Sequence, residues 1–175
     1  SLTKWDLGKN PNFLIEVLRN LENKEVKLIL AGNWVQERVK QNCIEKIKEY
    51  NLAKRVEITG RADEQAKKFF FSGARVLIHP IFEAFGMFGL EAAACGCPII
   101  VPKGSGVTDL FESGIHGWFP QEGDLDSYVK FINKLVENER LSYQMGYRSW
   151  EVAKQHTWLD HSKRLLGLIK RYEED

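Results

Sequence analysis

Two glutamates, Glu83 and Glu91, lie in a stretch that otherwise has the composition of a buried core, "EAFGMFGLEAAACGCP", which runs from Glu83 to Pro98. The residues between them are apolar or glycine. An ionised carboxylate is costly to bury unless it has a partner. The pattern therefore predicts a partner for each carboxylate, supplied either by the protein itself or by a bound molecule.

A phosphate site is predicted between the two glutamates. A helix is expected to begin near Met87, so the backbone amides of residues 86–88 lack helical partners and lie at the positive end of the helix dipole. Such amides bind anions, and Gly86 lets a phosphate approach the main chain closely. Lys9, in a loop near the start of the sequence, would add a mobile positive charge to the same phosphates.

The two carboxylates suit hydroxyl groups on either side of that phosphate. Glu91 lies one helical turn beyond Met87 on the same face, where a carboxylate would accept hydrogen bonds from the vicinal hydroxyls of a ribose. Glu83 precedes the helix and can reach a group beyond the phosphates. A phosphate bridge between a ribose and a second hydroxyl-rich group describes a nucleotide sugar.

The same residues also have purely structural interpretations. Glu91 would then pair with an internal arginine or cap a helix, and Glu83 would be a solvated loop residue. Phe85, Met87 and Phe88 are expected to be packing groups more often than ligand platforms. The run Gly104-Ser105-Gly106 lacks the third glycine of a dinucleotide fingerprint, so it indicates NAD binding only weakly.

The elements that would position these residues alternate along the chain. Apolar runs predict strands at 26–31, 56–59, 74–79 and 98–101, with an edge strand at 117–119. Helical spacing, Pro11 and the N-cap residues Asp63 and Asp124 predict helices at about 11–21, 37–50, 64–71, 87–95, 108–112, 124–135, 139–155 and 159–173.

This alternation predicts an α/β fold, a doubly wound (Rossmann-like) parallel sheet with helices on both faces. Ligands of such sheets bind beyond the carboxyl ends of the strands, here the loops 4–10, 32–36, 60–63, 80–87 and 102–107. The opening residues Ser1-Leu2-Thr3 resemble the end of a strand. We therefore expect residues 1–175 to form one domain, a lobe of a larger protein, closed by the helices of 139–175.

Composition excludes several classes of function. The 175 residues are 43% apolar and 28% charged with a net charge of +1, so no nucleic-acid or membrane-surface partner is expected. Three cysteines form no disulfide framework, and Cys95 and Cys97 have no second pair to complete a zinc site, so no metal is expected. No transmembrane run or signal peptide appears, and a cytoplasmic location is expected.

The segment from Pro80 to Pro98, "PIFEAFGMFGLEAAACGCP", resembles the nucleotide-sugar signature of the family-four (group 1) glycosyltransferases. In that signature two glutamates flank Phe-Gly and precede a small-residue helix, Gly-x-Pro and an apolar strand. The similarity extends to "GKNPNFLIEVL", "LILAGN", "VEITGRADEQ" and "GSGVTDLFESGIHGWF", and covers nearly the whole chain.

The resemblance implies the C-terminal, donor-binding lobe of a two-lobed GT-B enzyme, with the N-terminal acceptor lobe outside this sequence. It implies transfer of a sugar, with retained anomeric configuration, from a UDP- or GDP-linked donor to an unknown acceptor. It further implies that no cofactor or metal is needed and that the isolated chain transfers no sugar.

The resemblance also assigns residues. Glu83 and Lys9 would be catalytic, with Glu83 on the donor sugar and Lys9 on the departing diphosphate. The remaining donor-binding residues would be Glu91 on the ribose, the amides of Gly86, Met87 and Phe88 on the distal phosphate and sugar, and Arg61 near the base. Family members usually carry an arginine a few residues before the first-loop lysine. Here either Lys4 would substitute for it or the site would rely on Lys9 alone.

Three other functions stay open. A sugar-nucleotide 2-epimerase can share this fold and ligand class but would release nucleotide diphosphate without an acceptor. A non-catalytic nucleotide-sugar-binding module is made conceivable by the missing arginine. A pyridine-nucleotide dehydrogenase comes last, because the first strand's loop has no glycine fingerprint.

Overall fold

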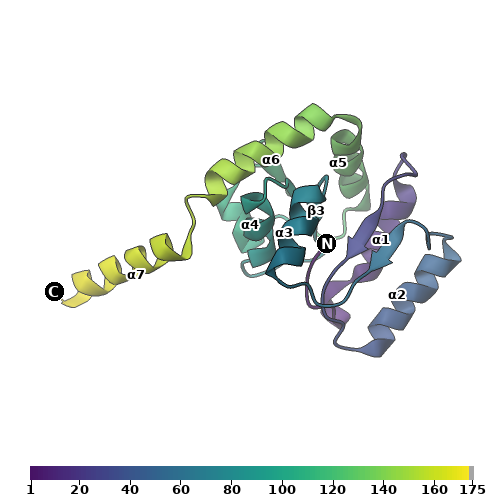
Figure 1. Cartoon of the computed structure of the whole chain (residues 1–175), viewed down its shortest axis with the longest axis horizontal. Coiled ribbons are helices and arrows are strands. Elements are labelled where there is room, and N and C mark those ends of the chain that lie inside the picture. The colour runs from purple at the N-terminus through teal and green to yellow at the C-terminus, as the bar shows by residue number, and fades with distance from the viewer. Residues whose placement is uncertain (174–175) are drawn as a thin grey trace.

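The computed structural model describes residues 1–173, and its short strands alternate with helices as predicted (Figure 1). The strands are β1 (Leu28–Leu30), β2 (Val56–Ile58), β3 (Leu77–Ile78), β4 (Ile99–Ile100) and β5 (Gly117–Trp118). The α-helices are α1 (Pro11–Asn20), α2 (Glu37–Glu49), α3 (Glu64–Gly73), α4 (Met87–Ala94), α5 (Leu125–Glu137), α6 (Glu139–Ala153) and α7 (Trp158–Glu173). Two 3-10 helices, η1 (Leu7–Lys9) and η2 (Gly106–Leu110), lie in loops.

All strand pairs are parallel, as predicted, but the strands form two separate sheets rather than the one sheet that was expected. One sheet is β1-β2, with Leu28 opposite Val56. The other is β3-β4-β5, with Leu77 opposite Ile99 and β5 at the predicted edge. β1 and β3 are therefore both end strands of their sheets.

Helices cover both faces of the strands. Alternate residues of β3 and β4 join different apolar clusters: Ile78 and Ile100 pack with α1, α2 and α5, whereas Leu77 and Ile99 pack with Phe71 of α3 and with α4. Because successive strand side chains point to opposite faces, the two clusters lie on opposite sides of the sheet. The result is a three-layer α/β/α arrangement.

The predicted helix starts are confirmed by their caps. The Asp63 carboxylate accepts a hydrogen bond from the Ala66 amide at 2.8 Å, and the Asp124 carboxylate accepts one from the Ser127 amide at 3.1 Å. Pro11 occupies the first turn of α1, where its missing N–H is not needed. The helix predicted at 108–112 is a 3-10 helix that begins two residues earlier, at Gly106.

The two predicted closing helices differ in their packing. α6 packs on α4 and α5, whereas Figure 1 shows α7 leading away from the rest of the chain. Apolar side chains of α7, among them Leu165, Leu166 and Ile169, are exposed. Residues 174 and 175 of the predicted closing region lie outside the described residues.

Candidate functional site

The loops that follow the strands meet at the carboxyl edge of the sheets, where the sequence predicts a ligand. The amide of Gly32, after β1, donates to the carbonyl of Gly60, after β2, at 3.0 Å. Gly32 also has φ +127°, and a Cβ built there would lie 1.8 Å from the Thr3 carbonyl oxygen. Only glycine fits at this contact, so the loops after β1 and β2 and the segment that leads to Lys9 are held together.

The loop that carries Glu83 is fixed by the segment after β4. The amides of Gly106 and Val107 donate to the carbonyls of Glu83 and Phe85 at 3.1 and 2.6 Å, and the Glu83 amide lies 3.2 Å from Ser105 Oγ. These hydrogen bonds fix the position of the backbone at residues 83–85, directly before α4. The position of the Glu83 side chain is therefore determined by two loops.

Glu83 belongs to a group that we call the inner cluster, formed by Lys9, His79 and Glu83. Glu83 Oε1 lies 2.5 Å from Lys9 Nζ and 3.0 Å from His79 Nε2. The Glu83 side chain is only 21% exposed, so the interpretation of Glu83 as a solvated loop residue is wrong. Lys9 and Glu83, which the sequence predicts on opposite sides of a phosphate, contact each other directly in the structure.

His79 was not predicted as a site residue. It is fully buried at the end of β3, its ring packs on Phe88 with centroids 4.3 Å apart, and its carbonyl accepts from Tyr128 Oη at 2.5 Å. Burial lowers its pKa to about 4, although the nearby Glu83 carboxylate opposes this shift. The imidazole is therefore neutral near pH 7, and because a carboxylate can only accept, we assign the tautomer whose Nε2–H donates a hydrogen bond to Glu83.

Glu91 belongs to an outer cluster, formed by Glu64, Lys67 and Glu91. Lys67 Nζ lies 2.7 Å from Glu64 Oε1 and 3.0 Å from Glu91 Oε1. The hydrogen bond to Glu64 raises the pKa of Lys67, and the bond to Glu91 acts in the same direction. The internal cation expected for Glu91 is thus a lysine of α3 rather than an arginine. The helical spacing of apolar residues in α3 does not indicate that Lys67 would contact α4.

The start of α4 has the features predicted for an anion site. Gly86 is the N-cap with φ +87° and no side-chain cap, and its carbonyl accepts from the Gly89 amide at 2.9 Å. The amides of Met87 and Phe88 are first-turn groups without an intrahelical acceptor. Phe88 packs as predicted, whereas Phe85 and Met87, which were expected to be packing groups, are 40% and 41% exposed.

The two remaining predicted cations lie at the surface. Lys4 and Arg61 are exposed, and neither forms a salt bridge within residues 1–173. Both belong to loops at the same sheet edge as Lys9. The edge thus combines uncapped amides, four cations and two carboxylates whose lysine partners a ligand could replace.

Two further findings concern the described part of the chain. No helix within residues 1–173 is long and apolar enough to cross a membrane. No group of three or more His, Cys, Asp or Glu side chains there is arranged to hold a metal ion.

A family model and a curated relative that are similar to this chain both describe glycosyltransferases. The family model described as glycosyl transferases group 1 matches residues 4–151. An uncharacterized glycosyltransferase of Methanocaldococcus jannaschii is 26% identical over 167 residues, which cover 95% of this chain and 45% of the relative. The chain therefore spans less than half the length of that relative.

Solved structures share the fold at low sequence identity. The Anabaena protein HepE, in complex with UDP and glucose, has a TM-score of 0.89 and 19% identity, covering 97% of this chain and 47% of HepE. The C-terminal domain of the Francisella tularensis group 1 family protein LpcC has a TM-score of 0.78 and 16% identity, covering 87% of this chain and 81% of that domain.

Proposed function

Because the chain belongs to the group 1 glycosyl transferases, we propose that it is the donor-binding lobe of a retaining enzyme that uses a nucleotide-diphosphate sugar. Its parallel α/β architecture is the Rossmann-like fold of GT-B glycosyltransferases, as the sequence predicted. The observation that carries the proposal is the pairing of Glu83 and Glu91 with separate lysines on either side of the uncapped start of α4.

The proposed donor lies along this edge. Glu91 would exchange Lys67 for the ribose hydroxyls, because its side chain is 35% exposed and can turn to a ligand. The amides of Gly86, Met87 and Phe88 would bind the distal phosphate and sugar, and the diphosphate would draw the Lys9 ammonium away from Glu83. Arg61 would lie near the base and Lys4 would serve as the second cation. A UDP- or GDP-linked donor fits this layout, and HepE was crystallised with UDP and glucose.

The proposed reaction breaks the bond between the sugar's anomeric carbon and the phosphate oxygen. The acceptor hydroxyl oxygen forms the new bond on the same face, and its proton passes to the departing β-phosphate. Glu83, oriented by His79, would hold the donor sugar's hydroxyls, and Lys9 would neutralise the diphosphate in place of a metal. The acceptor would come from a separate N-terminal lobe, so we propose that this chain alone binds nucleotide but transfers no sugar.

A calorimetric titration of the chain with UDP, GDP, ADP, their sugar conjugates and NAD tests the proposal. We expect one nucleoside diphosphate to bind, and Glu91→Ala to weaken its binding by roughly 2 kcal/mol, about thirtyfold, without loss of fold. Glu64→Ala is the matched control, because it removes the other carboxylate on Lys67 and should leave affinity unchanged.

Unchanged affinity in Glu91→Ala would return Glu91 to a structural role and contradict the proposed site. Binding of NAD alone would favour a dehydrogenase. Sugar transfer by the isolated chain, with any acceptor, would contradict the assignment of the acceptor groups to another lobe.

A further inference from the structure

A hollow of about 720 Å³ lies at the amino-terminal ends of β1 and β2, whereas the proposed donor site lies at the carboxyl ends of the strands. Its walls come from the segment before β1, the last turn of α2 and the turn before β2. We call it the basic hollow, because its charged lining residues are five cations and one carboxylate: Lys24, Lys27, Lys48, Lys54 and Arg55, with Glu25. Folding therefore gathers a positive charge that the even composition of the sequence does not reveal.

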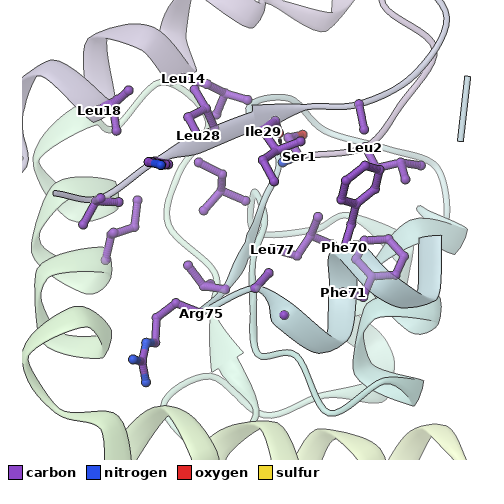
Figure 2. A pocket seen from close by; sticks show the side chains of 18 of the residues that line it. Ser1, Leu2, Leu14, Leu18, Leu28, Ile29, Phe70, Phe71, Arg75 and Leu77 are labelled. Atoms are coloured by element: carbon purple, nitrogen blue, oxygen red, sulfur yellow. Dashed lines mark hydrogen bonds between the residues drawn. The ribbon is translucent and has the colours of Figure 1, made fainter. Parts of the chain in front are cut away.

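No salt bridge within residues 1–173 involves any of the five cations of the basic hollow. Cations on neighbouring elements are paired: Lys46 contacts Glu16, and Arg75 Nη1 lies 3.3 Å from Glu139 Oε1. Figure 2 shows Arg75, which precedes β3, directed away from the apolar pocket drawn there. The protein thus supplies carboxylates for neighbouring cations but leaves those of the basic hollow available to a bound anion.

The ends of two helices account for only part of this charge. Lys24 Nζ donates to the carbonyls of Leu21 and Arg19 at 2.6 and 3.3 Å, at the end of α1, and Lys48 lies in the last turn of α2. Each helix C-terminus carries about half a negative charge, so the two together offset about one unit. Five cations and one carboxylate give the basic hollow a net charge of +4, so about three positive charges stay unbalanced.

Arg55 is held in place within the basic hollow. Its Nε donates to the Val26 carbonyl at 3.0 Å, and its Nη2 donates to the Asn23 carbonyl at 3.3 Å. Its main chain is fixed as well, because its amide donates to the Leu52 carbonyl and its carbonyl accepts from the Leu28 amide, both at 2.8 Å. Burial lowers the pKa of Arg55, but an arginine stays protonated near pH 7. A fixed and partly desolvated guanidinium binds phosphate more strongly than a mobile, fully solvated cation does.

We propose that the basic hollow binds a compound with two or more phosphate groups, at a site separate from that of the donor. Two phosphate monoesters carry a charge of about −3 to −4 near pH 7, which matches the unbalanced positive charge. The volume of about 720 Å³ is that of a small-molecule site. Because the cations converge from three segments on a concave site, a compact anion fits better than a flat membrane surface or an extended nucleic-acid backbone.

The cations of the basic hollow have different tasks in this complex. Arg55 holds one phosphate in a fixed geometry. The mobile ammonium groups of Lys27, Lys48 and Lys54, which are exposed, adapt to the remaining phosphates. Lys24 stays with the carbonyls at the end of α1 and adds its charge from there.

The test is a calorimetric titration of the chain with inorganic tripolyphosphate, together with amide NMR spectra of the free and bound chain. We expect one ion to bind per chain and to shift the amide signals of residues 24–27 and 51–55. Lys48→Gln combined with Lys54→Gln should weaken binding at least about tenfold, because two charge-assisted contacts are lost. Both side chains are exposed, so this double variant should fold. The matched control combines Lys130→Gln with Lys134→Gln on the exposed face of α5, and it should change the affinity less than about twofold, because distant charges are screened.

Several results would overturn the proposal. Amide shifts confined to residues 86–88 would place tripolyphosphate in the donor site instead. Equal weakening by the two double variants would indicate general charge attraction, and equal affinity for inorganic phosphate would show that a second phosphate is not recognised. Binding to phosphatidylserine vesicles, without binding of tripolyphosphate, would assign the cations to a membrane surface. None of these results depends on nucleotide binding, so the proposal can fail while the proposed donor site stands.

Discussion

The inner and outer clusters each contain a lysine–glutamate ion pair, but the two pairs differ in the elements that supply them and in their exposure. In the inner cluster the partners come from loops 74 residues apart, both side chains are about 20% exposed and the third member, His79, is fully buried. In the outer cluster Lys67 and Glu91 come from the adjacent helices α3 and α4, and Glu64 is 81% exposed. The inner cluster is therefore anchored on a fully buried side chain, whereas the outer cluster joins a partly buried lysine, at 18% exposure, to two more exposed carboxylates.

The difference determines what a ligand must replace. Removing one member of a poorly solvated ion pair leaves the other charge unpaired, but a solvated pair contributes little. Substitutions in the inner cluster should therefore change stability and binding together. In the outer cluster, substitution of Glu91 should weaken binding with little change in stability, and substitution of its neighbours should have small effects on both.

Glu83→Ala should have the largest effect. It leaves the Lys9 ammonium and the His79 N–H without their acceptor, so we expect the free energy of unfolding in urea to fall by about 3–4 kcal/mol. Glu83→Gln keeps an acceptor and should lose less. In the folded fraction, binding of the sugar-linked donor should weaken more than binding of the bare nucleotide. Equal loss for both ligands would contradict the proposed place of Glu83 beside the sugar.

His79 should make the inner cluster sensitive to acid. Its pKa is about 4 in the folded chain and 6.5 as an unperturbed group, so between these values the unfolded chain binds more protons. Stability should therefore fall as pH drops from about 6.5 to about 4, by up to about 3 kcal/mol. His79→Gln removes this titration. Urea unfolding of the unchanged protein and of His79→Gln, at several pH values between 4 and 6.5, therefore separates the contribution of His79 from that of other groups. Parallel pH profiles would show that His79 is not buried as a neutral ring.

Lys67→Ala should have the smallest effect. The Lys67 side chain serves two carboxylates at a partly solvated site, so we expect a change of about 0.5 kcal/mol in the free energy of unfolding. Nucleotide affinity should stay within about threefold, because Glu91 remains available. The measurements are urea unfolding and calorimetry. A loss of stability as large as that of Glu83→Ala would contradict the difference in stabilising effect between the inner and outer clusters.

Local signals predicted most of the fold. Pro11, Asp63 and Asp124 set helix starts through contacts within one turn, and apolar runs located each strand. The strands are shorter than their apolar runs, since residues such as Val26 and Ala74 continue the run without continuing the ladder. The division into two sheets was not predicted, because an apolar run locates a strand but does not show which other strand it pairs with.

The candidate site was predicted only in part. The loop and helix positions of Glu83, Gly86 and Glu91 follow from one contiguous motif. Their partners His79 and Lys67 were missed, because contacts that join β3 to a loop and α3 to α4 leave no periodic pattern in either segment. For Phe85 and Met87 the residue type itself was misleading. Apolar side chains suggest burial, but the place of these two at the start of a helix exposes them.

Gly106 has a consequence for how this gene tolerates change. A Cβ at this position would lie 2.2 Å from the Ala84 carbonyl oxygen, and that backbone atom cannot move without displacing the Glu83 loop. A single-base change that converts the codon of Gly106 to alanine would alter no charge and no polar group. It would nevertheless force apart the two segments that hold Glu83, so an allele that looks conservative would act as a loss-of-function allele.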